Sequence, residues 1–318
     1  MSSSVEPVET PEIAVGTHYF RQAYLYALAT QAEVLNHVRT QALPEERDQA
    51  PGILESWRAL QPQVQHLQTA EVGLAETISL VALPSEADEL VKGFAADPAF
   101  QKTFATLPSQ FSMVEVDKLV AAQRTVNLDY VERLVASYPT SPTLEDLLNI
   151  CVSPKRTMEP IQHLEVAPNT HVFSSPNSDI RFIGAFLKQN LTPEDLAYAE
   201  QGGIPAAAII AFVGYGAAPI NVLMAGQRVV LNNGFHRVYA LRQLGVMHIP
   251  VVVQQIRNPQ LEFPPAIAGL PSEYLLGAAR PVLIKDFFEP GFTITLKVRD
   301  RVKMVTVGIA RNEHEVPS

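Results

Sequence analysis

The feature that most constrains this chain is a regular succession of short apolar runs and turn residues between Ile220 and Val253. The runs Ile220–Met224 and Val229–Leu231 are rich in β-branched and other apolar residues, which is typical of strands. The intervening segment Ala225–Arg228 contains glycine and is short enough for a tight turn. The pattern therefore predicts a β-hairpin.

A helix and a further strand are expected directly after this hairpin. Gly234 permits a sharp turn, and the apolar spacing that follows predicts a helix from Phe235 to Leu244. Gly245 is a typical residue for the end of that helix. The β-branched run Ile249–Val253 then predicts a buried strand. This order of strand, turn, strand, glycine, helix and strand predicts a mixed α/β domain.

The predicted start of the helix carries polar groups suited to an anion. The first amides of a helix lack internal partners, and with the helix dipole they favour negative charge. Arg237 adds a guanidinium group, His236 can exchange a proton near neutral pH, and Asn233 adds a polar side chain beside Gly234. These residues predict a phosphate-binding turn, with His236 as the candidate catalytic residue. The alternative is that Gly234 only makes a turn and that the His-Arg pair is a solvated helix end or a local cap.

An upstream segment is expected to contribute to the same domain. Met113–Val116 alternates apolar and polar residues, as a half-buried strand does. Gln123 and Arg124 follow it. Leu128–Val135 then has helical apolar spacing, with Asn127 as its N-cap.

These two segments resemble the signature blocks of the ParB/sulfiredoxin-like superfamily. Val229–Val253 is similar to the second block, in which a strand precedes Gly-x-His-Arg, an Ala/Leu-rich helix and Leu-Gly-x-x-x-Ile-Pro-Val. Val114–Leu134 resembles the first block. The resemblance implies an α+β fold, with a ParB/sulfiredoxin-like domain at 109–256 and a long insert at about 137–215.

The resemblance also implies a ligand. Members of this superfamily include ATP-dependent sulfiredoxins, CTP-dependent ParB switches, ADP-dependent serine kinases and some nucleases. Carried onto this sequence, Gly234, His236 and Arg237 would contact phosphate, and Gln123 and Arg124 would face them. The implied ligand is a nucleotide or phosphorylated small molecule, such as ATP or CTP with Mg²⁺.

Several positions depart from the family pattern. Phe235 stands where sulfiredoxins carry their reactive cysteine, so sulfiredoxin chemistry is not expected. Gln123 lies nearest the place of a glutamate base, and an amide cannot accept a proton at neutral pH. Glu115 or Asp117 could serve instead. Asn233 replaces the usual aspartate before the glycine, which removes a candidate Mg²⁺ ligand.

The remaining sequence predicts flanking regions around this domain. Residues 1–15 are expected to be a flexible tail, and residues 16–108 an all-helical region that begins with Phe20, Tyr24 and Leu28 on one helical face. The extension 257–318 is expected to be small and β-rich. Within it, Phe292–Val298 and Val302–Ile309 are predicted to pair as a hairpin across a charged turn.

The most apolar run of the chain, Ile204–Ile220, is expected to be buried core. It contains two prolines and two glycines and is shorter than the roughly 20 residues of a membrane-spanning helix. The chain start, Met1–Glu6, lacks the basic and apolar regions of a secretory signal. Because Cys151 is the only cysteine, an internal disulfide is impossible and a cytoplasmic location is expected.

Composition narrows the function classes. With 47% hydrophobic and 18% charged residues, the chain can form a substantial core. The formal net charge of -9, without a cluster of Lys and Arg, disfavours direct DNA binding. No helix-turn-helix is expected after Gln254, which argues against a partition role. The eight histidines show no metal-binding spacing, so no metal site is expected.

Two hypotheses follow from the sequence. In the first, the chain is a nucleotide- or phosphate-binding protein with phosphotransfer or phosphohydrolase activity. In the second, it is a non-enzymatic regulatory or assembly protein that binds a protein partner through the N-terminal helices. The substitutions at Gln123 and Asn233 favour the second hypothesis, whereas the intact Gly-Phe-His-Arg start favours a retained ligand. The oligomeric state is not predicted.

Overall fold

The chain divides into two compact units in the computed structural model, which describes residues 19–153, 160–167, 169–175, 179–197, 203–216, 218–300 and 302–310. We call them the core unit, residues 17–156 and 217–300, and the inserted unit, residues 1–16, 157–216 and 301–318. The structure is mixed α and β, with helices dominating the N-terminal part and strands the later part, as predicted. The expected flexible tail at 1–15 lies outside the described residues.

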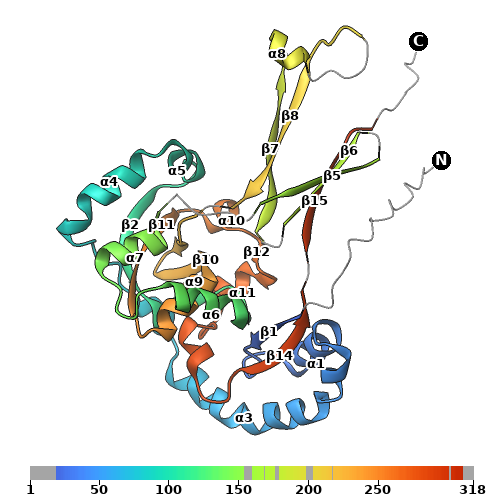
Figure 1. The fold of residues 1–318 in the computed structure, drawn as a ribbon. Helices are drawn as coiled ribbons and strands as arrows, with labels where there is room; N and C mark the ends of the chain where they lie inside the picture. Colours follow the sequence, from blue (N-terminus) through green and yellow to red (C-terminus); the bar gives the residue numbers. More distant parts are fainter. Residues whose placement is uncertain are drawn as a thin grey trace, which may run out of the picture. The chain divides into compact units, whose positions relative to one another are not determined.

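The core unit contains most of the helices (Figure 1). Its α-helices are α1 (Gln31–Gln41), α2 (Pro44–Arg47), α3 (Ala50–Ala70), α4 (Asp88–Ala96), α5 (Pro98–Thr103), α6 (Leu128–Ser137), α7 (Leu144–Cys151), α9 (Phe235–Gln243), α10 (Pro259–Glu262) and α11 (Ser272–Gly277). Its short 3₁₀ helices are η1 (Leu74–Thr77), η2 (Ser85–Ala87), η3 (Val116–Lys118) and η4 (Ile284–Phe288).

The strands of the core unit form one five-stranded sheet and two smaller sheets. The five-stranded sheet has the order β2 (Ser109–Glu115), β11 (His248–Ile256), β9 (Asn221–Ala225), β10 (Arg228–Asn233) and β3 (Val120–Ala121). The three-stranded sheet has the order β14 (Ile294–Arg299), β1 (Tyr19–Tyr24) and β4 (Thr125–Asn127), and β12 (Ala266–Ile267) pairs with β13 (Leu270–Pro271).

The predicted succession of elements around Gly234 is confirmed. β9 and β10 form the expected antiparallel hairpin, α9 follows Gly234, and β11 lies beside β9 in parallel orientation. The predicted N-cap is also confirmed, because the Asn127 side chain accepts a hydrogen bond from the Tyr130 amide at 3.0 Å. Val238 and Leu241 of α9 are fully buried, as their spacing predicts.

The predicted helical face of Phe20, Tyr24 and Leu28 is wrong for the first described residues. Tyr19–Tyr24 is strand β1, which pairs with β14 on one side and β4 on the other. This pairing buries Tyr24 and satisfies the backbone on both sides. A four-residue spacing such as Phe20 to Tyr24 also fits one face of a strand, since 4 is a multiple of its period of 2. Long-range partners therefore decided the structure here.

The N-terminal region shares its core with the predicted α/β domain. Leu25 and Val64 pack in the same buried cluster as Val238 of α9 and Val251 of β11. A second cluster joins Val34 and the N-terminal helices to strand β14. Residues 16–108 therefore do not form a separate helical domain.

The described residues of the inserted unit form strands and one short helix. Its elements are β5 (Gln162–Ala167), β6 (Thr170–Ser175), β7 (Ile180–Lys188), α8 (Pro193–Leu196), β8 (Ala208–Tyr215) and β15 (Lys303–Gly308). β15, β6 and β5 form one antiparallel sheet, and β7 pairs with β8 in a second. The insert predicted at 137–215 thus begins later than expected, because α7 belongs to the core unit.

Two expectations about apolar segments are corrected here. The predicted C-terminal hairpin does not form, since β14 pairs with β1 whereas β15 pairs with β6. The run Ile204–Ile220 is not buried throughout, because Ile204 is 99% exposed and Ile209 is 66% exposed. Within the described part of the chain, no helix combines the length and hydropathy needed to cross a bilayer.

Candidate functional site

The two sequence blocks predicted to form a site meet at one edge of the five-stranded sheet. β10 and β3 run parallel, with Val230 beside Val120. Their carboxyl ends therefore lie at the same edge, where open α/β sheets commonly bind ligands. The blocks are also in direct contact, because the Asn127 amide donates a hydrogen bond to Nε2 of His236 at 3.2 Å.

Gly234 makes the turn from β10 into α9. Its φ is +92°, in the left-handed region that strongly favours glycine. A Cβ at this position would lie 2.6 Å from Cγ1 of Ile220, so a larger residue would collide with the core. The Gly234 amide is satisfied locally by Oδ1 of Asn233 at 2.8 Å. Neighbouring groups of the chain itself therefore fill the inner side of this turn.

Arg237 uses its guanidinium group to hold two distant backbone segments. Nη1 donates to the Ile150 carbonyl at 2.9 Å, and Nη2 donates to the Ala218 carbonyl at 2.6 Å. Ile150 lies shortly before the chain enters the inserted unit, and Ala218 lies just after its return. The Ile220 amide also bonds to the Cys151 carbonyl at 2.6 Å. The start of α9 thus joins the two core-unit segments that flank the insert.

His236 is neutral at physiological pH. Burial lowers the pKa of its imidazole to about 4. Because Nε2 accepts the Asn127 amide, this bond assigns the ring proton to Nδ1. The ring also meets the edge of Tyr130, with centroids 5.3 Å apart. The lone pair that a general base would use is already engaged, so this geometry supports a structural role for His236.

Gln123 and Arg124 also have internal partners. Nε2 of Gln123 donates to the Thr125 carbonyl at 2.7 Å. Nη1 of Arg124 forms an ion pair with Oε1 of Glu33 at 2.7 Å. Within the described residues, Nε of Arg124 is buried and has no hydrogen-bond partner. Among the predicted phosphate contacts in the described part of the chain, it is the one buried side-chain nitrogen without a hydrogen-bond partner.

Glu33 brings a negative charge to this arginine from the N-terminal region. It also completes the capping box of α1, accepting the Thr30 amide at 2.6 Å. Burial raises the pKa of Glu33, but the hydrogen bonds from Thr30 and Arg124 outweigh burial and leave its pKa below the usual range. The guanidinium group of Arg124, which the sequence assigns to an external phosphate, is therefore paired with a carboxylate of the chain itself.

The acidic residues considered as alternative bases are held in ion pairs. Asp117 binds Arg242 with a distance of 2.6 Å between Oδ1 and Nε. Glu115 binds Lys118 at 2.9 Å. Among the described residues, no group of three or more His, Cys, Asp or Glu side chains could hold a metal ion.

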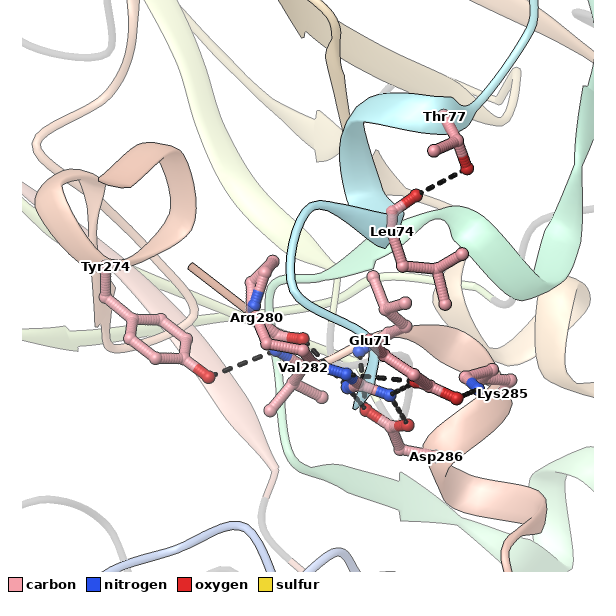
Figure 2. Close-up of polar contacts among 10 residues, drawn as sticks. Glu71, Leu74, Thr77, Tyr274, Arg280, Val282, Lys285 and Asp286 are labelled. Atoms are coloured by element: carbon pink, nitrogen blue, oxygen red, sulfur yellow. Dashed lines mark hydrogen bonds and ion pairs between the residues drawn. The ribbon is translucent and has the colours of Figure 1, made fainter. Parts of the chain in front are cut away.

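Sequence reasoning did not identify the most buried ionic cluster of the core unit (Figure 2). Arg280 has a side chain only 2% exposed, and it bonds to both Asp286 and Glu71. Lys285 also pairs with Glu71. Figure 2 shows these charged groups converging between the end of α3 and the η4 segment. Because 209 residues separate Glu71 from Arg280, no local spacing could indicate the cluster.

Comparisons with known proteins identify no relative: no protein-family model matches the chain, and neither a curated protein nor a solved structure matches it.

Proposed function

We propose that this chain is a non-enzymatic regulatory or assembly protein built on a ParB/sulfiredoxin-like domain. The bonds from Arg237 to the Ile150 and Ala218 carbonyls carry this proposal. The main cation of the predicted phosphate turn stabilises the chain's own backbone. The order of β9, β10, Gly234, α9 and β11 supports the proposed fold relationship.

The groups available for proton transfer also favour a role without catalysis. His236 is neutral and its Nε2 atom is engaged, while Gln123 carries an amide. Asp117 and Glu115 are bound to cations. General acid–base chemistry needs a group with a suitable pKa and a free path to the substrate. This candidate site offers no such group among the residues that the sequence singled out.

A nucleotide screen tests the proposal directly. We expect ATP, ADP, CTP and GTP with Mg²⁺ to be neither bound nor turned over by the chain of residues 1–318. A ligand at 100 times its Kd would stabilise the fold by about 2.7 kcal/mol, which thermal shift readily detects. Phosphate release or phosphotransfer above the level of the Arg237→Ala variant would overturn the non-enzymatic proposal.

A second candidate function is phosphate or nucleotide binding in which Arg124, and not the α9 turn, makes the main contact. The buried and unpartnered Nε of Arg124 favours it, because a buried donor without an acceptor costs free energy that a ligand could recover. Under this candidate, Glu33→Gln should tighten ATP or CTP binding by removing a competing charge. Arg124→Ala should abolish binding. Calorimetry on both variants, with exposed Glu89→Gln as the control, separates this candidate from the first.

A further inference from the structure

Two histidines of the inserted unit are in contact on the β15–β6–β5 sheet. Nε2 of His163 lies 3.0 Å from Nδ1 of His171, and the two rings are stacked with their centroids 5.2 Å apart. His163 belongs to β5 and His171 to β6, which pair as antiparallel neighbours. The two positions are eight residues apart in sequence, so the pairing of the strands is what brings these nitrogens together.

The strand register places both imidazole rings on the same face of the sheet. His163 lies opposite Phe173, and Glu165 lies opposite His171. Opposite residues share a face, as do residues two positions apart on one strand, so all four side chains project from one side. The His163 ring also stacks on Phe173, with centroids 4.8 Å apart. Because β6 is the central strand, the backbone of His171 is held on both sides.

Two facing ring nitrogens have two possible chemical uses. A neutral imidazole has one N–H group and one nitrogen with a lone pair, so one ring can donate a hydrogen bond to the other. Alternatively, both rings can present lone pairs to a metal ion. Nitrogen ligands about 2.0 Å from an ion are about 2.8 Å apart at a right angle and about 3.3 Å apart in a tetrahedron. The separation of 3.0 Å between His163 and His171 lies between these values.

The charges around this histidine pair favour a cation. Glu165 is exposed on the same face, and its Oε1 atom accepts the Asn169 amide at 3.2 Å. Directly opposite residues have Cβ atoms about 5 Å apart, so the Glu165 carboxylate lies near the His171 ring. Strands β5 and β6 contain no Lys or Arg. Lys303 of β15 lies opposite Ser175, at the other end of β6 from Glu165.

We propose that His163 and His171 together bind one divalent transition-metal ion, with Cu²⁺ as the preferred ion. Imidazole is a suitable ligand for Ni²⁺, Cu²⁺ and Zn²⁺, and affinity along this series is highest for Cu²⁺. Two nitrogens near a right angle also fit the tetragonal geometry of Cu²⁺. Since the described residues contain no metal-binding group of three or more side chains, water completes the coordination. This site is separate from the α9 turn and does not depend on the regulatory or assembly role.

Calorimetric titration of CuCl₂ into the chain of residues 1–318, without an affinity tag, tests this inference. We expect one ion per chain with a Kd in the micromolar range or tighter. His163→Gln and His171→Gln should each weaken binding about tenfold or more, because each removes one of the two protein ligands. The matched control is His66→Gln, which replaces an exposed histidine of α3 and should leave the affinity unchanged. No binding by wild type in this range, or equal affinity in wild type and both ligand variants, would overturn the inference.

Electron paramagnetic resonance of the Cu²⁺ complex identifies the ligands directly. We expect hyperfine coupling to two imidazole nitrogens in wild type and to one in His163→Gln or His171→Gln. Glu165→Gln should weaken binding about threefold and keep both nitrogen couplings, because its charge acts across solvent without coordinating the ion. A wild-type spectrum with a single imidazole nitrogen would contradict the inference. Nucleotide turnover would instead overturn the non-enzymatic proposal and leave the metal site unaffected.

Discussion

At the start of α9, polar side chains are bonded to their own chain, whereas on the β7–β8 hairpin apolar side chains remain in solvent. Arg237 donates to two backbone carbonyls and His236 accepts a backbone amide. On the hairpin, Phe186 is 48% exposed and Leu187 is 57% exposed. The comparison teaches that a recognisable polar motif can have all its hydrogen bonds within the chain, while an ordinary apolar run can remain exposed to solvent.

The largest effect is expected from the buried ionic cluster of the core unit. Asp286 is fully buried, accepts the Leu283 amide at 2.8 Å and binds Arg280. Asp286→Ala would leave the Arg280 charge without its closest partner, at a cost of about 3–5 kcal/mol. Urea unfolding measures this change. The exposed pair of Lys92 and Glu89 is the control, since Lys92→Ala should cost about 1 kcal/mol or less.

Gly234→Ala tests whether the α9 turn is packed as tightly as the comparison requires. The substitution combines an unfavourable φ of +92° with a collision against Ile220, and we expect a loss of about 2–4 kcal/mol. Gly226→Ala is the matched control, because its φ is +60° but no atom lies within 4 Å of the added Cβ. Equal losses in the two variants would show that the turn has room for a ligand.

The pH dependence of stability should report the neutral state of His236. Its pKa falls from 6.5 when unfolded to about 4 when folded, so the unfolded state binds the proton more tightly. The stabilisation is complete above about pH 6.5 and is lost as pH falls towards 4. A pKa change of this size corresponds to about 3 kcal/mol, and the partial exposure of the residue reduces this to about 2 kcal/mol.

Thermal unfolding between pH 4 and 7 measures this effect. His236→Gln should flatten the pH profile, although His37, whose pKa burial also lowers to about 4, will keep part of the slope. The control is His66→Gln, which replaces an exposed histidine of α3. A profile for His236→Gln that matches wild type would show that the imidazole is more accessible to solvent than its low pKa implies.

The smallest effect on folding is expected on the hairpin. Phe186→Ser should change the free energy of unfolding of the chain by about 0.5 kcal/mol or less, because the side chain is half exposed. Phe292→Ala, at a fully buried position of the core unit, should cost about 3–5 kcal/mol. A large loss for Phe186→Ser would mean that the hairpin is packed within a single copy and would remove the contrast between the two regions.

Local patterns predicted the elements whose neighbours in sequence are also their neighbours in space. The hairpin β9–β10, the glycine turn, α9 and β11 follow from apolar spacing and turn residues within a single stretch. The N-cap at Asn127 follows from residue type alone. The strand Tyr19–Tyr24 could not be predicted from local patterns. Its partner β4 lies more than 100 residues away in sequence, and its partner β14 lies more than 250 residues away.

The candidate site shows the same difference between features set by local sequence and features set by distant segments. The sequence singled out Gly234, His236 and Arg237 together as a candidate phosphate-binding turn, and the structure brings them next to the first block through Asn127. The sequence could not show that the backbone carbonyls of Ile150 and Ala218 accept hydrogen bonds from Arg237. A side chain's hydrogen-bonding capacity is fixed by its chemistry, but the group that satisfies it is chosen by the fold.

The sequence by itself determined the α/β succession around Gly234, the acidic balance of the chain and the absence of a disulfide. Only the tertiary structure decided that the polar turn is internally bonded, that Glu33 neutralises Arg124 and that the apolar run in β8 is exposed. The physical reason is the same in each case. Local conformation depends on residues a few positions apart, whereas burial and the pairing of charges depend on segments brought together from distant parts of the chain.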